Sequence, residues 1–303
     1  MISGDPSILK AGSGAHDRLQ LQTARVSYLE PHVWGRGGDS AFAILRAARQ
    51  GSFNVVTAQD PFFRGCIAWF AARVSHARLN LQVHTDLSAH SVWRQMLSNF
   101  LLRRADSIRV VSQKIKEQVL NMGVHAPVTV LPVFVDLARF KNITHRPHPY
   151  FQKTIVWAGR FEAEKDPLYA LEILKEVRKR GIDTGLVMLG IGSMEQILRR
   201  QAEGLPVEFP GWQDPIGYLA QADVVVSTSL HESWGASIVE ALVAGVPVVA
   251  PDVGIAKEAG AVVVAREKIA ETVAEILRRG GRGELKIHLL NKNEWAKVWK
   301  ESL

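Results

Sequence analysis

Residues 222–254 read ADVVVSTSLHESWGASIVEALVAGVPVVAPDVG, and this stretch decides the fold. The β-branched run 222–228 is typical of a buried strand, and a helix and a second buried strand follow it. The loop between them therefore leaves the carboxyl end of a strand and enters the N-terminus of a helix. In open α/β folds, anionic ligands bind at this kind of junction.

The residues at this junction predict what kind of ligand it holds. Trp234, Gly235 and Ala236 are expected to present backbone N–H groups at the positive end of the helix, which suits a phosphate or diphosphate. Glu240 lies about one turn into the helix, where a carboxylate can accept hydrogen bonds from both hydroxyls of a ribose. Glu232, in the loop, can hold the hydroxyls of another polyol. The arrangement fits a sugar on either side of a phosphate.

Composition and length set the broad class. The chain has 303 residues, of which 47% are hydrophobic and 22% charged, enough for two compact globular domains. The single cysteine, Cys66, excludes an internal disulfide framework and fits a reducing compartment. No apolar run reaches the ~18 residues of a spanning helix, and the N-terminus lacks the pattern of a signal peptide. We therefore expect a cytoplasmic protein, either free or peripheral at the inner face of the plasma membrane.

Positive charge is concentrated in the first half of the chain. Residues 1–150 carry 18 Lys+Arg against 9 Asp+Glu, a net charge of +9, whereas residues 151–303 carry 19 against 21, a net charge of −2. A basic half suggests an anionic partner, such as a membrane surface, a phosphorylated acceptor or nucleic acid. Nucleic acid is the least expected of these, because no recognition module is visible.

Strands and helices alternate along the rest of the chain. In the first half we expect strands at 1–3, 25–34, 53–57, 79–84, 107–111 and 128–133, with helices from about 15 and at 40–49, 62–73 and 91–105. In the second half we expect strands at 154–158, 185–190 and 261–264 beside the central pair, with helices at 166–180, 216–220, 267–279 and 294–303. The first strand is unusually short.

Segment 141–151 (KNITHRPHPYF) breaks this periodicity with two prolines and several polar residues, which predicts a domain boundary. We expect an N-terminal Rossmann-like domain at 1–145, a C-terminal Rossmann-like domain at 146–285 and a last helix within 286–303, in which Trp295 and Trp299 are expected to be packing residues.

A second cationic loop supports a phosphate ligand. Arg160 and Lys165 lie between a predicted strand and the helix that Asp166 and Pro167 begin. At such a junction an arginine fork and a lysine point charge can converge on a diphosphate. Solvated surface side chains are the alternative for either residue alone.

The Glu232-to-Glu240 spacing, the surrounding SWGASIVEALVAGVPVVA and the upstream GRFEAEK at 159–165 together resemble the retaining glycosyltransferases of family 4, which have the GT-B fold. The resemblance implies two doubly wound α/β domains facing a cleft, with 1–145 as the acceptor-side domain and 146–285 as the donor-binding domain. It also implies that the helix within 286–303 packs back on the first domain. It further implies transfer of a sugar, with retained configuration and without a metal or other cofactor, from a UDP- or GDP-type nucleotide sugar to a sugar or lipid-linked acceptor. The alternative for a lone glutamate pair is solvated carboxylates flanking a helix.

The resemblance also implies roles for individual residues. His84, Glu232, Arg160 and Lys165 would be catalytic, with the two cations and the helix N-terminus stabilising the departing diphosphate in place of a metal. The donor would contact a set of residues from the second domain: Arg160, Lys165, Gly211, Trp212, Glu232, Ser233, Trp234, Gly235, Ala236 and Glu240. The acceptor side would comprise Gly12, Ser13, Gly14 and His84.

Two loops depart from the family pattern. The histidine stands in QVHTD, with no glycine after His84, and residues 132–136 read PVFVD where the family has a Pro-Asn-Gly-Val-Asp sequence. Two alternatives therefore stay open. One is a GT-B nucleotide-sugar epimerase, which uses water in place of a sugar acceptor. The other is a degenerate member that binds nucleotide or membrane without turnover.

The predicted helix at 91–105 permits two interpretations. Its apolar stripe comprises Trp93, Met96, Leu97, Phe100 and Leu101, with arginines elsewhere around the helix. The conservative interpretation is a helix packed on the parallel sheet with basic ends. The other is a helix that lies on an anionic bilayer. No cysteine and histidine residues have zinc-site spacing.

Overall fold

The computed structural model describes residues 1–35 and 38–303. These residues form two compact units: unit 1 comprises Met1–Val135 and Leu290–Leu303, and unit 2 comprises Asp136–Leu289. The division lies ahead of segment 141–151, because the short helix η3 (Leu137–Phe140) already packs against α9 (Ala236–Val243) of unit 2.

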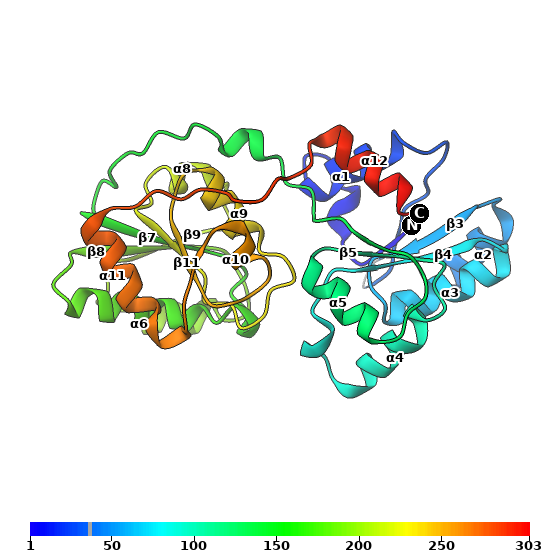
Figure 1. Ribbon diagram of the computed structural model, residues 1–303, viewed down its shortest axis with the longest axis horizontal. Coiled ribbons are helices and arrows are strands. Elements are labelled where there is room, and N and C mark those ends of the chain that lie inside the picture. Colours follow the sequence, from blue (N-terminus) through cyan, green and yellow to red (C-terminus); the bar gives the residue numbers. More distant parts are fainter. Residues whose placement is uncertain (36–37) are drawn as a thin grey trace. The chain divides into compact units, whose positions relative to one another are not determined.

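Unit 1 is built on a parallel six-stranded sheet with the order β2-β1-β3-β4-β5-β6. Its strands are β1 (Ile2–Ser3), β2 (His32–Val33), β3 (Val55–Ala58), β4 (Arg78–Val83), β5 (Ser107–Val110) and β6 (Val128–Val130). Its helices are η1 (Pro6–Leu9), α1 (Gly14–Thr23), α2 (Ala41–Gln50), α3 (Phe63–Ser75), η2 (Leu87–Ala89), α4 (Val92–Leu102), α5 (Gln113–Asn121) and α12 (Lys292–Glu301). Figure 1 shows α1 and α12 side by side on one face of this sheet, and α3 and α4 on the other.

Unit 2 repeats the plan with a parallel sheet in the order β12-β11-β10-β7-β8-β9. Its strands are β7 (Lys153–Ala158), β8 (Thr184–Leu189), β9 (Val207–Gly211), β10 (Val224–Val226), β11 (Val248–Ala250) and β12 (Val262–Val263). Its helices, besides η3 and α9, are η4 (Ala163–Lys165), α6 (Pro167–Lys179), α7 (Glu195–Gln201), α8 (Ile216–Leu219), α10 (Ala256–Ala259), η5 (Arg266–Lys268) and α11 (Ile269–Arg279). The predicted α/β class with two doubly wound sheets is confirmed.

The two units have differently composed interiors. The core of unit 2 is apolar, with α6 and α11 packed against each other and against strands whose side chains are buried on both faces. In unit 1, the sheet face beneath α1 and α12 is instead polar. It carries the buried side chains of Ser3, Thr57, Asn80, Gln82, Ser107 and Arg109.

The last helix, α12, covers part of this polar face. Trp299 is fully buried and Trp295 is 5% exposed, and both pack in a cluster with Leu131. The Trp295 indole donates a hydrogen bond to the carbonyl of Pro132 over 2.8 Å, and the Asn80 amide donates to the carbonyl of Ser302 over 2.8 Å. The helix is therefore an integral part of unit 1.

Two local predictions were wrong, and one helix of unit 1 was not predicted. The strand expected at 25–34 shrinks to β2, because most of the preceding residues are not buried and Tyr28 is 67% exposed. Helix α5 had no predicted counterpart. Asp166 precedes α6 in a left-handed conformation (φ 42°), and its carboxylate pairs with Arg266 instead of capping the helix.

The conservative interpretation of 91–105 also needs correction. Leu101 is fully buried against unit 1, as a packed helix requires. However, Trp93, Met96 and Phe100 are 79%, 58% and 43% exposed, so much of the apolar stripe faces solvent. No helix within the described part of the chain is long and apolar enough to cross a membrane.

Candidate functional site

The junction between β10 and α9 has the local structure that an anion site needs. Gly235 has φ 102° and precedes the helix, and no side chain caps it. Within the described residues, the N–H groups of Gly235, Ala236 and Ser237 have no hydrogen-bond acceptor. Free donors at a helix N-terminus favour binding of an anion.

The loop after β11 supports this junction from behind. Gly254 has φ 53°, and a Cβ there would collide with the carbonyl of Trp234 and the side chain of Glu232. Ile255 donates its N–H to the same carbonyl over 3.0 Å. Trp234 is 4% exposed, so its indole is part of the core, while its backbone shapes the junction. Ser233 is half-buried in the same loop.

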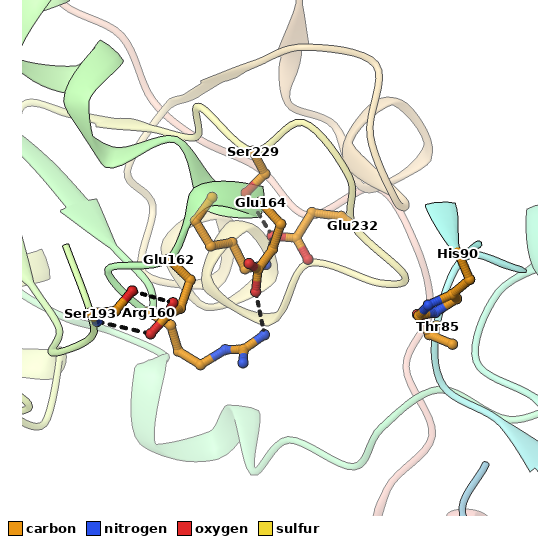
Figure 2. A network of polar contacts seen from close by, with 9 residues as sticks. Thr85, His90, Arg160, Glu162, Glu164, Ser193, Ser229 and Glu232 are labelled. Carbon is orange, nitrogen blue, oxygen red and sulfur yellow. Dashed lines mark hydrogen bonds and ion pairs between the residues drawn. The ribbon is translucent and has the colours of Figure 1, made fainter. Parts of the chain in front are cut away.

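Lys165 and Glu232 form an ion pair next to this junction. The exposed fractions of their side chains are 17% and 13%, and Ser229 donates a hydrogen bond over 2.9 Å to the same carboxylate oxygen, Oε1 of Glu232 (Figure 2). Thr228 fixes the backbone of Lys165 by donating its hydroxyl to the Lys165 carbonyl over 2.8 Å. The structure therefore brings together two residues that are far apart in sequence and were both predicted for the donor site.

Arg160 lies on the same side of unit 2, in a network that Figure 2 shows. It pairs with Glu164 over 2.7 Å, and their side chains are 64% and 42% exposed. The neighbouring Glu162 accepts hydrogen bonds from the N–H and hydroxyl of Ser193, over 2.9 and 2.7 Å. An exposed ion pair such as Arg160–Glu164 contributes little stability, so the arginine can change partners at small cost.

Glu240 has an environment suited to hydrogen bonding with a ligand. Burial raises the pKa of its carboxyl to about 7, an effect that the Arg139 cation opposes and the Asp214 carboxylate reinforces. Arg139 and Asp214 pair with each other, one from η3 and one from the loop after β9. Within the described residues, no side chain or backbone group donates a hydrogen bond to the Glu240 carboxylate.

The remaining predicted donor residues, Gly211 and Trp212, lie at the end of β9. Gly211 has φ 82° and accepts a hydrogen bond from the N–H of Gly190, while the Trp212 side chain is 68% exposed. An exposed indole two residues from Asp214 offers a flat surface for a nucleotide base.

His84 follows β4 and lines a pocket of about 320 Å³ within unit 1. The ring is open to the interior of this pocket, and its Nε2 atom lies 3.1 Å from Oε1 of Gln82. The enclosing protein, Arg109 and Arg18 hold the pKa of His84 far below its usual range, so the ring is neutral at neutral pH.

The predicted acceptor residues 12–14 lie between two segments that line the His84 pocket. Gly14 is the first residue of α1, and Ser13 caps that helix by accepting a hydrogen bond from His16 over 3.0 Å. Gly12 has φ 80° in the preceding turn. Residues 12–14 do not line the His84 pocket, whereas Gly4 and Asp5 do. Among the described residues, the pocket lining of this region therefore comes from both before and after 12–14.

Several residues at these places were not predicted. Arg139 and Asp214 reach the donor-side residues through tertiary contacts, which the local sequence does not reveal, whereas Ser229 bonds to Glu232 within the same loop. Arg109 is different, because an arginine inside the short strand SIRV is a visible irregularity. In the parts of the chain that the structure describes, no three His, Cys, Asp or Glu side chains gather as metal ligands would.

Both halves of the chain match known protein families. Residues 8–139 match the family described as Glycosyltransferase Family 4, and residues 152–279 match the family described as Glycosyl transferases group 1. Among curated proteins, the chain is 32% identical over 144 residues to the GDP-mannose-dependent alpha-(1-6)-phosphatidylinositol dimannoside mannosyltransferase of Mycobacterium tuberculosis, covering 44% of this chain and 38% of that protein. It is 30% identical over 216 residues to the phosphatidyl-myo-inositol mannosyltransferase of Mycobacterium leprae, covering 67% of this chain and 56% of the relative. The chain thus spans only part of the length of these relatives.

Solved structures share the fold. Anabaena Alr3699/HepE, solved in complex with UDP-glucose, aligns with a TM-score of 0.67 at 17% identity over 96% of this chain and 85% of the other. TarM aligns with a TM-score of 0.66 at 16% identity over 88% of this chain and 55% of the other. These matches identify the fold as that of the GT-B proteins.

Proposed function

The chain belongs to the group 1 glycosyltransferases, family 4, and on that premise we propose that it transfers a sugar from a nucleotide-diphosphate sugar to a sugar or lipid-linked acceptor. The observation that carries the proposal is the grouping of Lys165 and Glu232 beside the uncapped N-terminus of α9. The relatives named above are transferases, which favours transfer over epimerisation.

The donor would bind to unit 2. The diphosphate would accept hydrogen bonds from the free N–H groups at the start of α9 and from Lys165 and Arg160. Each cation is paired with a carboxylate, so donor binding would exchange Glu232 and Glu164 for phosphate oxygens. Glu232, released from Lys165, would then be available to the hydroxyls of the transferred sugar, and Glu240 to those of the ribose.

The same groups would serve the reaction. Negative charge builds on the diphosphate as the sugar departs, and two cations with a helix N-terminus can stabilise that charge without a metal. We propose retention of configuration, with the neutral ring of His84 near the acceptor. The base of the nucleotide is proposed to be uracil or guanine.

Calorimetric titration tests the donor site. UDP, GDP and ADP would be titrated with and without EDTA into the wild type, Glu240→Ala and Lys165→Ala, with Lys175→Ala as a matched control on α6. We expect one nucleotide to bind independently of EDTA, and both site variants to weaken it at least about tenfold. Folded protein that binds none of the three would overturn the proposal in favour of the non-catalytic alternative. Nuclear magnetic resonance of the sugar product with the preferred donor then tests retention.

Attachment to an anionic bilayer is the second part of the proposal. Exposed apolar side chains cover α3 and α4: Phe63, Phe70 and Val74 on α3, with Val92, Trp93, Met96 and Phe100 on α4, all 43–79% exposed. Arg73 on α3 and Arg94 on α4 are exposed, as are Arg103 and Arg104 directly after α4. We call these residues the α3–α4 surface. Exposed aromatic groups mixed with arginines are typical of surfaces that bind anionic lipid.

Vesicle sedimentation tests the α3–α4 surface. Wild type is expected to bind vesicles containing phosphatidylglycerol but not neutral phosphatidylcholine vesicles, and Trp93→Ser with Phe70→Ser is expected to weaken binding at least about tenfold. Phe42→Ser on α2, which removes another highly exposed aromatic ring, is the control. Equal binding by all variants, or none by the wild type, would contradict this part of the proposal.

A further inference from the structure

Unit 1 contains a buried arginine whose charge no carboxylate balances. Arg109 lies within β5 and is 4% exposed. Its guanidinium donates a long hydrogen bond of 3.4 Å to the Ser302 hydroxyl and lies 5.7 Å from the centre of the Trp299 ring. No Asp or Glu side chain in the described parts of the chain forms an ion pair with it. A buried charge without a partner is costly, so its retention in a strand calls for a function.

Two further arginines line the pocket that Arg109 shares with His84. Arg18 comes from α1 and forms no ion pair with any described carboxylate. Burial lowers its pKa, and the nearby carboxylates of Asp5 and Asp17 oppose this effect only in part. Arg64 pairs with Asp60, yet its Nε atom is buried and finds no hydrogen-bond acceptor among the described residues.

Asp60 pairs with Arg64, and Asp5 and Asp17 act on Arg18, whereas no described carboxylate pairs with Arg109. Asp5 is the one carboxylate among the described pocket-lining residues, and its Oδ1 atom already accepts hydrogen bonds from the N–H and hydroxyl of Ser7, over 2.9 and 2.6 Å. Burial lowers the pKa of Arg109 to about 9, which leaves the guanidinium charged at neutral pH. The pocket is therefore positive, at the end of the sheet where α/β proteins bind ligands.

The other polar groups of the pocket are neutral. Gln59, Gln82 and the neutral ring of His84 can donate or accept hydrogen bonds with hydroxyl groups. At about 320 Å³, the cavity is near the lower end of the range for ligand pockets and has room for one sugar or polyol ring with an anionic substituent.

We propose that this pocket binds an oxyanion through Arg109, Arg18 and Arg64, and that the acceptor carries a phosphate or carboxylate group near the hydroxyl that is glycosylated. Oxyanion binding by the pocket depends only on unit 1, whereas the charged group on the acceptor rests on the proposed function. Guanidinium groups bind both phosphate and carboxylate with paired, charge-assisted hydrogen bonds. The pocket would therefore recognise the negative charge and the oxygen geometry that these two groups share.

The test is calorimetry on the full chain in low-salt buffer free of phosphate. Glycerol 3-phosphate and glucuronate are the charged probes, and glucose at the same concentrations is the neutral one. Arg109→Gln and Arg18→Gln remove pocket charges; Arg49→Gln removes an exposed charge on α2 of the same unit and is the matched control. A melting temperature for each variant identifies unfolded protein, and Arg18, which is only half-buried, keeps the test decisive if Arg109→Gln fails to fold.

We expect at least one charged probe to bind and glucose not to bind. Each pocket variant should weaken that binding at least about tenfold, and Arg49→Gln less than about twofold. Equal binding by the wild type and both folded pocket variants, or no charged probe binding at all, would overturn the inference. The probe that binds names the group, phosphate or carboxylate.

Titrating UDP and GDP into the same preparations separates this inference from the proposed function. Nucleotide binding without oxyanion binding would contradict the assignment of the pocket and would still support the donor site. Oxyanion binding without nucleotide binding would support the pocket and contradict the assignment of its ligand as an acceptor.

Discussion

The Nε2 atom of His84 lies 3.1 Å from Oε1 of Gln82, and the orientation of that glutamine amide is itself fixed. Gln82 donates through its amide nitrogen to Thr57 over 2.7 Å, Thr57 donates to Oδ1 of Asn80 over 2.7 Å, and Asn80 donates to Ser107 over 2.9 Å. Each hydrogen bond in this series therefore has a defined donor and acceptor, and the Gln82 amide presents its oxygen to His84. The Nε2 atom of His84 must carry the proton, which leaves Nδ1 as an acceptor.

This relationship predicts a single tautomer. Long-range ¹H–¹⁵N spectra of the wild type should show His84 protonated only at Nε2 at pH 7, and still neutral at pH 5, because its pKa is lowered. In Gln82→Met the ring loses its acceptor, so both tautomers should appear, and the free energy of unfolding should fall by about 1–3 kcal/mol because Thr57 loses its buried partner. His125→Gln, an exposed position, helps assign the spectrum. Protonation at Nδ1 in the wild type would contradict the assignment.

Glu240 should make nucleotide binding depend on pH. Its pKa in the folded chain is raised from 4.5 to about 7, so the carboxyl is mostly protonated at pH 6 and mostly ionised at pH 8. If the ionised form accepts the ribose hydroxyls, affinity should rise about tenfold between pH 6 and pH 8, with release of a proton on binding at pH 6. Calorimetry in buffers of different ionisation enthalpy measures both quantities.

Glu240→Gln is the control for that prediction, because the nucleotide phosphates also titrate near pH 6. The difference between wild type and variant isolates the contribution of the carboxyl. The raised pKa has a second consequence: the folded chain loses stability as pH rises from 4.5 to 7 at this position, so Glu240→Gln should be more stable than wild type above pH 7. Identical pH profiles for both proteins would refute the assignment.

The Lys165–Glu232 pair should couple stability to binding. Lys165→Met leaves a mostly buried carboxylate without its cation, so the free energy of unfolding should fall by about 1–3 kcal/mol. Adding Glu232→Gln should restore part of this loss, which a double-mutant cycle in urea measures. Nucleotide binding should stay weak in the double variant, since the cation is still missing. Additive losses of stability would show that the two side chains do not interact in solution.

Gly254 should not tolerate a side chain. Gly254→Ala adds a Cβ that collides with the backbone of Trp234 and places alanine at φ 53°, so the loop that supports the start of α9 must shift. We expect a loss of about 1–3 kcal/mol in stability and clearly weaker nucleotide binding. Gly217→Ala in α8 has open space for the added methyl and serves as the control. Wild-type nucleotide affinity in Gly254→Ala would contradict this role.

Trp299 should anchor α12 to unit 1. Trp299→Ala removes a fully buried indole and should lower the free energy of unfolding by about 3–5 kcal/mol, whereas Trp299→Phe keeps most of the apolar surface and should cost less. Denaturant titrations followed by circular dichroism measure both. A loss of less than about 1 kcal/mol in Trp299→Ala would mean that α12 is not held by this side chain.

Local sequence predicts the α/β fold well because strand and helix periodicities differ strongly here. The run 222–254 yields β10, α9 and β11 in the expected order, and His84 follows β4 directly, as predicted. The expected strand at 25–34 fails because Val26 and Leu29 pack against the cluster of Trp295 and Trp299, and among the described residues 25–31 have no neighbouring strand to pair with. Propensity alone does not reveal that absence.

The surroundings of the site depend on contacts that sequence order hides. Arg139 and Asp214, the charges that act on Glu240, are 75 residues apart in the chain. The pairing of Lys165 with Glu232 spans 67 residues and joins two separately predicted loops. The polar face under α12 likewise arises only when four strands align their small polar residues. The sequence spacing predicts each loop of the site, but the contacts between the loops appear only in the folded chain.

The division of the chain has a consequence for its synthesis. Unit 1 takes its last helix from residues 290–303, whereas unit 2 lies wholly between 136 and 289. On the ribosome, unit 2 is therefore complete before the residues that close unit 1 exist, the reverse of the usual order in which the first domain finishes first. Until Trp295 and Trp299 emerge, the polar sheet face and Arg109 remain uncovered, so this interval is when the nascent chain is most exposed to misfolding.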